Sequence, residues 1–433
     1  MKRQEECGLD KNVIHINRMD NSTDNLINTF ESRGFIYQCT DLEQLKTLTS
    51  EKKIKAYIGF DCTAKSLHVG SLIQIMMLRW LQKLGHQPII LLGGGTTKIG
   101  DPSGKDEARQ VLGLSDIEEN KASLQKVFAK FLDFKSSNRA IILDNDIWLR
   151  ELKYIDFLRD FGRFFSINRM INFESVKLRL DREQSLSFLE FNYMLLQAFD
   201  FYHLYEREEC ILQMGGSDQW GNIVNGVELI RKKLGKEAFG LTSPLLTTSS
   251  GAKMGKTEKG AVWLNDNMLS AYDYWQFWRN TEDADVIKFL KLFTELSLDE
   301  INKLSKLKGK EINKAKIILA DEATKLSHGI RASKLAKETA QKTFEEGSIG
   351  DNLPEYRIDL KDLERGIKLC KLFTQCGLAQ SNSASRKLIQ GNGAKINNEI
   401  VSDVKYIVTS ENFSKDMLKL SAGKKKHVII RLV

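Results

Sequence analysis

The hydrophobic pattern of residues 55–92 predicts a strand, a helix and a second strand in close succession. Residues 55–60 combine aromatic and branched apolar side chains, which indicates a short buried strand. Residues 68–84 are apolar on nearly every side and stop at Gly85, as a buried helix does. The run Ile-Ile-Leu-Leu at 89–92 predicts the second strand. Such a succession is a parallel crossover unit, right-handed by default.

Alternating strand and helix patterns continue to about residue 250. The predicted elements are a helix at 116–133, a strand at 140–143, and a strand at 210–214 followed by a helix from about residue 223. Between about 105 and 190 the apolar helical stretches exceed what a simple crossover needs, so we expect a connective insertion there, partly an interface with a second subunit. The pattern predicts an α/β fold, with a Rossmann-like parallel-sheet domain over 26–250 after a polar N-terminal extension at 1–25.

Within residues 251–350, the pattern after the K-M-G-K-T loop is wholly helical over 283–345. Ser297 and Glu300 match a capping box, and 312–344 shows one long helical pattern interrupted at Gly329. We therefore expect an all-α domain after the parallel-sheet domain.

A linker at Asn-Leu-Pro (352–354) leads to a final domain, about 360–433, that carries the excess charge of the chain. Residues 361–433 hold 14 Lys and Arg against 6 Asp and Glu, and the net charge of the whole chain is +8. The rest of the chain is therefore balanced. An asymmetry this complete favours a polyanion partner over a merely solvated face.

The composition is that of an ordinary globular chain, with 42% hydrophobic and 28% charged residues. The apolar runs are too short for a membrane span, and the polar, partly acidic residues 1–25 indicate neither a secretory signal nor a transit peptide. The six cysteines form no C-x-x-C pair and no spacing suited to zinc. We expect reduced thiols, a cytoplasmic protein and no tightly bound metal.

The region after the first strand indicates an anion site but fits neither common nucleotide fingerprint. G-x-G-x-x-G is absent, and Gly104-Lys105 is followed by Asp106 where a P-loop has Ser or Thr. His-Val-Gly-Ser at 68–71 places small residues at a helix start, where free backbone N–H groups favour a negative charge.

Three later stretches carry further candidate groups. The spacing of Tyr193, Gln197 and Asp200 puts them on one face of a helix. Asp218 follows a glycine corner after a strand, where a carboxylate can accept hydrogen bonds from ribose hydroxyls. Lys253 and Lys256, in a glycine-flanked loop, suit a phosphate clamp. Taken singly, each has an ordinary alternative: a solvated stripe, a turn, or surface lysines.

Taken together, the motifs H-V-G-S (68–71), Y-M-L-L-Q-A-F-D (193–200), G-G-S-D-Q-W-G-N (215–222) and K-M-G-K-T (253–257) resemble those of bacterial-type and organellar tyrosyl-tRNA synthetases, in order and spacing, from about residue 25 to the end. The resemblance implies a helical anticodon-binding domain over 251–350. It also implies a small α+β RNA-binding C-terminal domain of the kind shared with ribosomal proteins. Three residues depart from the family pattern: Ser71 replaces the second His of H-I-G-H, Cys62 a Pro, and Gly255 the first Ser of K-M-S-K-S.

The resemblance implies a role for each matching residue. The tyrosine-binding residues would be Tyr57, Asp101, Tyr193, Gln197, Asp200 and Gln213. The ATP-binding residues would be Gly59, Asp61, His68, Gly70, Ser71, Gly216, Asp218, Gln219, Lys253, Lys256 and Thr257. The residues that stabilise the transition state would be Thr63, His68, Lys253 and Lys256, and those that contact RNA phosphates would be Arg386, Lys387 and Lys395.

The resemblance implies activation of L-tyrosine by ATP and transfer of the tyrosyl group to tRNA(Tyr). It also implies a homodimer and no membrane partner. Mg²⁺ would arrive with ATP and not in a protein cage. Two alternatives stay open: a tryptophanyl-tRNA synthetase, which shares the fold, and a non-enzymatic RNA-binding protein on a synthetase scaffold. The basic tail and the Tyr57/Asp200 pair argue against the first, and the retained phosphate-binding motifs argue against the second.

Overall fold

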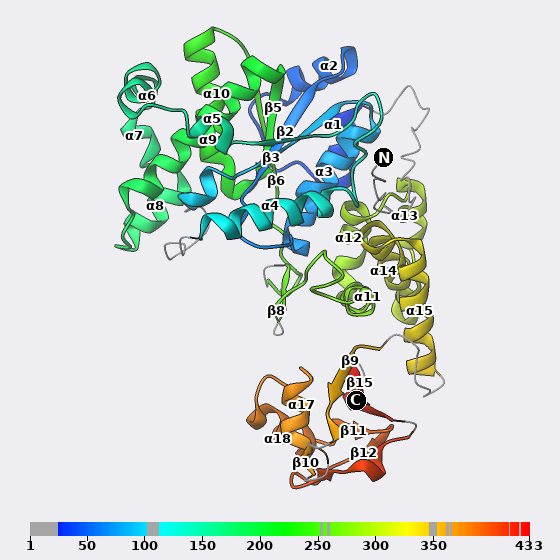
Figure 1. Cartoon of the computed structure of the whole chain (residues 1–433). Coiled ribbons are helices and arrows are strands. Elements are labelled where there is room, and N and C mark those ends of the chain that lie inside the picture. Colours follow the sequence, from blue (N-terminus) through cyan, green and yellow to red (C-terminus); the bar gives the residue numbers. More distant parts are fainter. Residues whose placement is uncertain are drawn as a thin grey trace, which may run out of the picture. The chain divides into compact units, whose positions relative to one another are not determined.

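The computed structural model describes residues 25–101, 112–251, 254–257, 260–345, 353–360, 363, 366–414, 416–423 and 426–433 (Figure 1). The chain divides into two compact units. One contains Ser71–Leu246 together with the chain before His68, and the other contains His68–Gly70 together with Thr247–Val433. The short H-V-G segment thus belongs to the second unit, although the residues on both sides of it belong to the first.

A six-stranded sheet forms the centre of the first unit, in the order β1-β6-β5-β2-β3-β4. The strands are β1 (Gln38–Cys39), β2 (Lys55–Phe60), β3 (Gln87–Leu92), β4 (Ile141–Asp144), β5 (Cys210–Gly216) and β6 (Phe239–Ser243). All neighbours are parallel except β1, which runs antiparallel to β6. The α/β fold class with a parallel sheet is confirmed.

The strand order reverses between β2 and β5, because the chain proceeds from β2 to β3 and β4 on one side and from β5 to β6 on the other. Tyr57 of β2 pairs with Ile89 of β3 on one side and with Gln213 of β5 on the other. In open parallel sheets, ligands bind beyond the carboxyl ends of the strands at such a reversal. Tyr57 and Gln213 therefore lie where the fold class favours a site.

Helices lie on both sides of this sheet (Figure 1). They are α1 (Leu26–Arg33), α2 (Leu42–Glu51), α3 (Leu72–Lys83), α4 (Leu114–Phe128), α5 (Asp146–Leu149), α6 (Tyr154–Asp160), α7 (Ile167–Met170), α8 (Glu174–Asp181), α9 (Phe188–Glu208) and α10 (Trp220–Leu234), with 3₁₀ turns η1 (Val69–Ser71), η2 (Thr96–Lys98), η3 (Gly162–Phe164) and η4 (Ser217–Gln219). The helix α9 begins with a capping box of Ser187 and Glu190, and α10 ends at Gly235 in the left-handed conformation. Helix α3 is buried on almost every side, as its uniformly apolar sequence predicts.

Two details differ from the sequence-based expectation. His68 does not start the helix but forms an isolated antiparallel bridge with Trp263, and the helix begins at Leu72 after a 3₁₀ turn. The edge strand β4 lies within the range 105–190, where a connective insertion was expected, yet it pairs with β3 as part of the main sheet. The extent of the insertion stays a prediction.

The helical part of the second unit follows a short hairpin. It comprises β7 (Lys256–Thr257), β8 (Gly260–Ala261), α11 (Ala271–Arg279), η5 (Asp283–Asp285), α12 (Val286–Phe293), α13 (Leu298–Leu304), η6 (Gly309–Glu311), α14 (Ile312–His328) and α15 (Ile330–Glu345). The predicted capping box of Ser297 and Glu300 is present. The break at Gly329 is also present, because its φ of 87° is costly for other residues and interrupts the helical path.

The C-terminal part has its own sheet and core. The five-stranded sheet has the order β12-β11-β14-β15-β9. Its strands are β9 (Glu355–Ile358), β11 (Ala394–Ile396), β12 (Glu399–Ile400), β14 (Met417–Ala422) and β15 (Lys426–Leu432); β10 (Ile367–Lys368) pairs separately with β13 (Ile407–Val408), and the other elements are α17 (Leu369–Gln375), α18 (Asn382–Gln390) and η7 (Ser410–Asn412). A single apolar cluster joins α17 and α18 to the strands, which confirms the α+β class. Among the described helices, none is long and apolar enough to cross a membrane.

Candidate active site

The buried carboxylate of Asp200 lies on α9, and its side chain is only 2% exposed. The Nδ2 amide of Asn145 donates to Oδ2 at 2.8 Å, and the indole N–H of Trp148 donates to Oδ1 at 2.7 Å. Burial raises the pKa of Asp200 to about 7, while these two donors act in the opposite direction. Asp200 is thus a deeply placed acceptor held in one orientation.

Tyr57 and Gln213, neighbours across β2 and β5, present buried polar atoms with no hydrogen-bond partner among the described residues. The Tyr57 side chain is 1% exposed, and burial together with the charge of Asp200 raises the pKa of its hydroxyl well above the ordinary value. A buried, unpaired hydroxyl destabilises the fold unless a ligand supplies its partner. The fold therefore places an unused hydroxyl in the electrostatic field of a buried carboxylate.

Thr96 and Asn145 link the Asp200 region to a second carboxylate, Asp61. The Thr96 hydroxyl donates to Oδ1 of Asp61 at 3.0 Å and accepts from Nδ2 of Asn145 at 3.1 Å. The hydroxyl of Tyr193 also bonds Asp61, at 3.2 Å to each oxygen. The resemblance had grouped Tyr193 with Asp101 around the tyrosine ammonium, and Asp61 with the adenylate. Here Tyr193 bonds Asp61, a residue of the other group.

A second polar chain contains Asp101, Gln219, Asn222 and Gln197. The Gln219 amide donates to Oδ2 of Asp101 at 2.8 Å, and the Asn222 amide donates to Gln219 at 3.2 Å and to Gln197 at 3.0 Å. Asp101 and Asn222 are buried, whereas Gln197 and Gln219 are half-buried. The chain is acceptor-rich at the Asp101 end, which suits an ammonium group.

The strand-to-helix corner after β5 is shaped by its glycine. A Cβ on Gly216 would lie 2.5 Å from a carboxylate oxygen of Asp218, so glycine allows that exposed carboxylate to lie against the backbone. Gly59 and Thr63, near the carboxyl end of β2, are also exposed. Asp61, Thr63 and Asp218 therefore follow the carboxyl ends of β2 and β5, where the fold class places a ligand.

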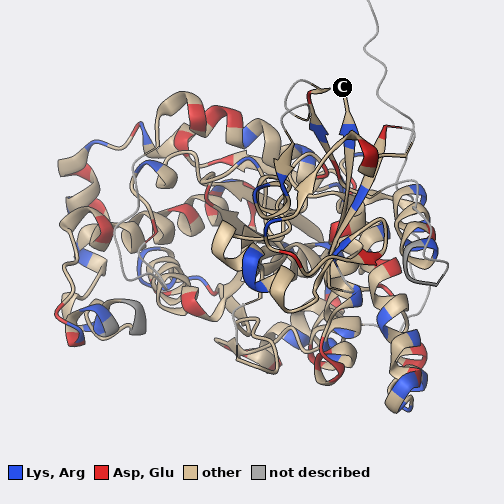
Figure 2. Cartoon of the chain, turned by 90° about the horizontal axis from the view of Figure 1, so that it is seen from below, with Lys and Arg blue, Asp and Glu red and all other residues tan. Residues whose placement is uncertain are grey.

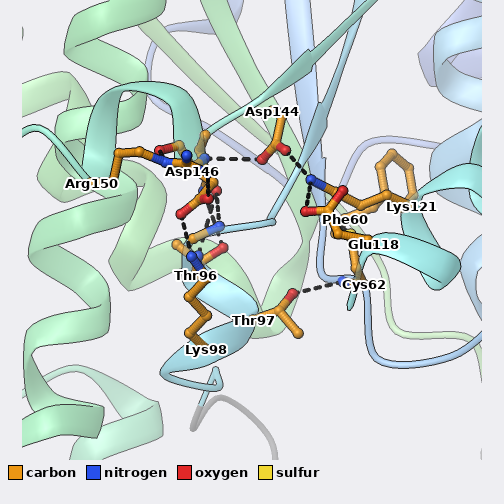
Figure 3. A network of polar contacts seen from close by, with 12 residues as sticks. Phe60, Cys62, Thr96, Thr97, Lys98, Glu118, Lys121, Asp144, Asp146 and Arg150 are labelled. Carbon is orange, nitrogen blue, oxygen red and sulfur yellow. Dashed lines mark hydrogen bonds and ion pairs between the residues drawn. The ribbon is translucent and has the colours of Figure 1, made fainter. Parts of the chain in front are cut away.

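A network of ion pairs holds the loop that carries Asn145 (Figure 3). Asp144 bonds Lys121 at 2.5 Å and accepts from the backbone N–H of Asp146 at 2.9 Å. Asp146 in turn bonds Lys98 at 2.6 Å and also pairs with Arg150. These contacts hold the residues on both sides of Asn145. They therefore fix the position from which its amide donates to Asp200.

In the second unit, His68 and Gly70 lie against the K-M-G-K-T hairpin. The Gly70 N–H donates to Nδ1 of His68 at 3.0 Å, and the His68 ring packs edge-on to Trp263, with centroids 6.3 Å apart. Ser71 caps no backbone group of α3 with its side chain. Lys253 lies outside the described residues, and of Lys256 and Thr257 the structure describes the backbone, as β7.

The base of that hairpin is bonded to the helical part. The backbone N–H of Ser249 donates to Asp285 at 2.7 Å, and its hydroxyl donates to Glu282 at 2.5 Å. Lys288 donates to the carbonyl oxygen of Thr247 at 3.1 Å. The segment leading into the lysine loop is therefore anchored to η5 and α12.

The predicted RNA-contacting residues lie in the C-terminal part. Arg386 and Lys387 are exposed on α18, and Lys395 is half-buried on β11. Figure 2 shows blue segments on the strands near the labelled C-terminus, with some red among them. Exposed cations of this kind can contact phosphates without reading a sequence.

Sequence reasoning missed Asn145, Trp148, Thr96 and Asn222, which position the predicted residues. Asn145 could have been found, because it is the first residue after β4 and so stands at a carboxyl strand end. Among the described residues, no group of three or more His, Cys, Asp or Glu side chains could hold a metal ion.

The chain matches two sequence families that together cover most of its length. Residues 49–345 match the family "tRNA synthetases class I (W and Y)", and residues 344–430 match the family "Tyrosine--tRNA ligase SYY-like C-terminal domain". The second match separates the chain from the tryptophan branch of the first family.

Similar proteins agree with these matches over nearly the whole chain. A tyrosine–tRNA ligase of Rickettsia felis is 57% identical over 408 residues, covering 94% of this chain and 99% of the relative. That of Pelagibacter ubique is 55% identical, covering 93% and 98%. A C-terminally truncated mitochondrial tyrosyl-tRNA synthetase of Aspergillus nidulans has a similar structure, with a TM-score of 0.68 and 30% identity over 74% of this chain and 94% of that one. The chain therefore belongs to the tyrosine–tRNA ligase family of class I tRNA synthetases.

Proposed function

We propose that the protein uses ATP to activate L-tyrosine as tyrosyl-adenylate and then transfers the tyrosyl group to the terminal ribose of tRNA(Tyr). Two buried groups support tyrosine as the substrate. One is the Asp200 carboxylate, which accepts two hydrogen bonds, and the other is the Tyr57 hydroxyl, which has no partner among the described residues. A phenol hydroxyl can donate to the first group and accept from the second. A phenyl ring can do neither, and an indole N–H can donate but cannot accept, so with either ring the Tyr57 hydroxyl would stay buried and unpaired.

The activation step needs positioning and charge stabilisation from the protein and no covalent residue. The tyrosine carboxylate, ionised at neutral pH, attacks the α-phosphorus of ATP; a new C(O)O–P bond forms, and pyrophosphate leaves with its electron pair. We assign the substrate ammonium to Asp101, Tyr193 and Gln197; Tyr193 bonds Asp61, whereas Asp101 and Gln197 belong to the polar chain through Gln219 and Asn222. His68, Thr63, Lys253, Lys256 and Thr257 are assigned to the phosphates, where negative charge accumulates on the leaving group.

The remaining assignments concern the nucleoside and the metal. Gly59, Gly70, Ser71 and Gly216 would let ATP approach the backbone, Asp218 would accept the ribose hydroxyls and Gln219 would lie beside the adenylate. Mg²⁺ would enter as part of the ATP substrate and neutralise phosphate charge. In the transfer step a ribose hydroxyl of tRNA attacks the tyrosyl carbonyl carbon, and AMP leaves.

We further propose that residues 251–350 bind the anticodon region and that 360–433 bind RNA phosphates through Arg386, Lys387 and Lys395. The support is the concentration of the net charge in the final segment. A protein ending near residue 350 should keep adenylate formation and charge tRNA poorly. Loss of pyrophosphate exchange in that truncation, with a folded remainder, would contradict the division of labour.

A homodimer through the region between β4 and α9 is a further part of this proposal. Large apolar side chains there are exposed on a single chain: Ile147, Tyr154, Ile155, Leu158, Ile167, Ile171, Leu180, Phe188 and Leu189. So much exposed apolar surface is typical of a protein–protein interface. Sedimentation of wild type and Ile155→Lys should show a dimer that dissociates in the variant.

A cytoplasmic location is also part of the proposal. The cysteines in the described part of the chain are all free, as is usual for cytoplasmic proteins.

The experiment that tests the central proposal is amino-acid-dependent ATP–pyrophosphate exchange with the purified full-length protein. Tyrosine should support exchange, and phenylalanine should support far less. Exchange with tryptophan instead would identify a tryptophanyl enzyme, and no exchange with any amino acid would indicate a binding protein. Charging of tRNA(Tyr) transcript then tests the second step.

A further inference from the structure

The geometry points to Gly255 as a positioning residue. Because this residue has no Cβ, the K-M-G-K-T hairpin packs directly on His68–Gly70, and the two phosphate-binding segments form one structural piece. The inference rests on the proposed function, since it specifies how the phosphate end of that site is assembled. It concerns a position where this chain has glycine and the K-M-S-K-S pattern has serine.

The first argument is steric. Gly255 has a φ of 100°, and a Cβ added to it would lie 2.7 Å from the backbone nitrogen of Gly70 and 2.9 Å from Nδ1 of His68. Carbon atoms do not approach backbone nitrogen this closely, and a backbone atom cannot swing aside as a flexible side chain can. This contact therefore requires glycine for two reasons: the positive φ is unfavourable for other residues, and there is no room for a Cβ.

The contact is glycine against glycine. A Cβ on Gly70 would lie 3.0 Å from the carbonyl oxygen of Met254 and 2.6 Å from Cε1 of His68. Both Met254 and Gly255 are buried, although their motif contains two lysines. The close packing thus depends on small residues in both segments at the same point.

Backbone hydrogen bonds join the same two segments. The N–H of Val69 donates to the carbonyl oxygen of Val262 at 2.8 Å, and the N–H of Val262 donates to the carbonyl oxygen of Gly255 at 2.9 Å. Val69 and Val262 are both buried, and His68 forms its bridge with the next residue, Trp263. The H-V-G segment is therefore hydrogen-bonded to the segment that follows β8, next to the position where Gly255 must fit.

This arrangement fixes the imidazole of His68 relative to the backbone of β7, which begins at Lys256, the residue after Gly255. Nδ1 of His68 accepts the Gly70 N–H, so a neutral ring carries its proton on Nε2 and can donate to a phosphate oxygen. A side chain at 255 would displace either the ring or the hairpin. Both displacements move a phosphate-binding group away from the developing charge while leaving the tyrosine-binding residues untouched.

The test compares Gly255→Ala with Gly260→Ala, a control in the same hairpin. Gly260 also has a positive φ, 112°, but a Cβ there would meet no atom within 4 Å, so this control reproduces the backbone strain without the collision. Single-turnover adenylate formation should slow roughly 10- to 100-fold in Gly255→Ala, as for a displaced catalytic group. The change in Gly260→Ala should be much smaller. The tyrosine dissociation constant should be unchanged in both variants.

Hydrogen exchange gives a second readout that does not need activity. The Val69 amide should be protected in wild type and in Gly260→Ala, and should exchange faster in Gly255→Ala. Equal slowing of adenylate formation in the two variants would overturn the proposal, because strain alone would then explain it. An unprotected Val69 amide in wild type would overturn it even if Gly255→Ala failed to fold. Absence of tyrosine-dependent exchange in wild type would instead refute the proposed function and leave the docking measurement valid.

Discussion

The Asp200 region of the first unit, which we propose to bind the phenol, and the His68 region of the second unit, which we propose to bind the phosphates, are built differently. Around Asp200 the structure uses long polar side chains from separate elements, buried and hydrogen-bonded to one another. Around His68 it uses backbone groups and glycines, with Gly70 and Gly255 in direct contact. Burying polar side chains costs free energy unless they are hydrogen-bonded, so the side chains around Asp200 already bond one another without substrate. The arrangement around His68 keeps the polar groups of the backbone available for a charge that forms during the reaction.

This difference teaches which property each region controls. A rigid set of buried donors and acceptors discriminates between substrates, because a substrate without the right hydroxyl leaves groups unpaired; tyrosyl-tRNA synthetase is the standard illustration of that asymmetry. A set of cations and N–H groups directed at a leaving group changes the barrier more than the affinity. Substitutions in the two regions should therefore affect different kinetic constants.

The largest effect is expected for Lys256→Ala, in the hairpin proposed to bind the phosphates. Removing one of the two loop cations should slow adenylate formation by roughly 10²–10³-fold, as for other removed electrostatic stabilisers. The tyrosine dissociation constant should hardly change. Single-turnover measurements at saturating ATP test this, with Lys303→Ala on an exposed helix position as the control. An unchanged rate would remove the distinction between the two regions.

Asp200→Asn, in the region proposed to bind the phenol, should have the next largest effect. A charge-assisted acceptor for the phenol is lost, so kcat/KM for tyrosine should fall by about 1.5–3 kcal/mol in transition-state free energy. The preference for tyrosine over phenylalanine should fall with it. If the loss were equal for both amino acids, Asp200 would act on the fold and not on the phenol.

The raised pKa of Asp200 gives this residue a pH signature as well. Burial raises its pKa from 3.8 to about 7, so the folded protein holds a proton that the unfolded chain releases. Its contribution to the free energy of unfolding should therefore fall as pH rises from about 4 through 7. Denaturant unfolding of wild type and Asp200→Asn at pH 5 and pH 8 measures this, and a pH-independent difference between them would contradict it.

Tyr57→Phe sharpens the comparison further by removing one neutral donor while Asp200 stays. The expected loss in tyrosine use is about 0.5–1.5 kcal/mol. The quantity to measure is the ratio of kcat/KM for tyrosine to that for phenylalanine in pyrophosphate exchange. Because the Tyr57 hydroxyl is unpaired among the described residues, its removal should also stabilise the ligand-free protein slightly. A ratio unmoved by the substitution would mean that Tyr57 does not bind the phenol.

The smallest effect is expected for Ser71→Ala. The Ser71 side chain caps no backbone group of α3, so its loss should cost about 1 kcal/mol or less, the value of one neutral hydrogen bond. His68→Ala should cost more, because His68 both bonds Gly70 and packs against the hairpin. Equal rate losses for the two substitutions would show that Ser71 contributes as much to activation as His68 does.

The elements were predictable from sequence because their patterns are local. The spacing of apolar residues predicted β2, α3, β3 and the helix break at Gly329. The spacing of Tyr193, Gln197 and Asp200 likewise predicted that they share one helix. The family resemblance located the motifs in the chain, and the comparisons confirmed the family.

The partners of those residues were not predictable, because they come from distant loops whose paths no periodicity encodes. Nothing in the pattern around Asn145 indicates that it bonds Asp200, 55 residues later. Likewise, the bond between Tyr193 and Asp61 spans 132 residues. The contact of Gly255 with Gly70 depends on the positive φ of Gly255 and on backbone packing, neither of which has a signature in hydrophobicity.

The strand order has a consequence for how the protein is made. β1 pairs only with β6 among the described strands, and Thr40 receives its hydrogen bond from Gly240, 200 residues later. β2 likewise gains its second neighbour only when β5 has been synthesised. A nascent chain that stops before residue 210 therefore exposes an unpaired edge of the strand carrying Tyr57, and exposed edges pair with other chains. Prematurely terminated products of this length should aggregate, whereas a chain extending past β6 closes the sheet on itself.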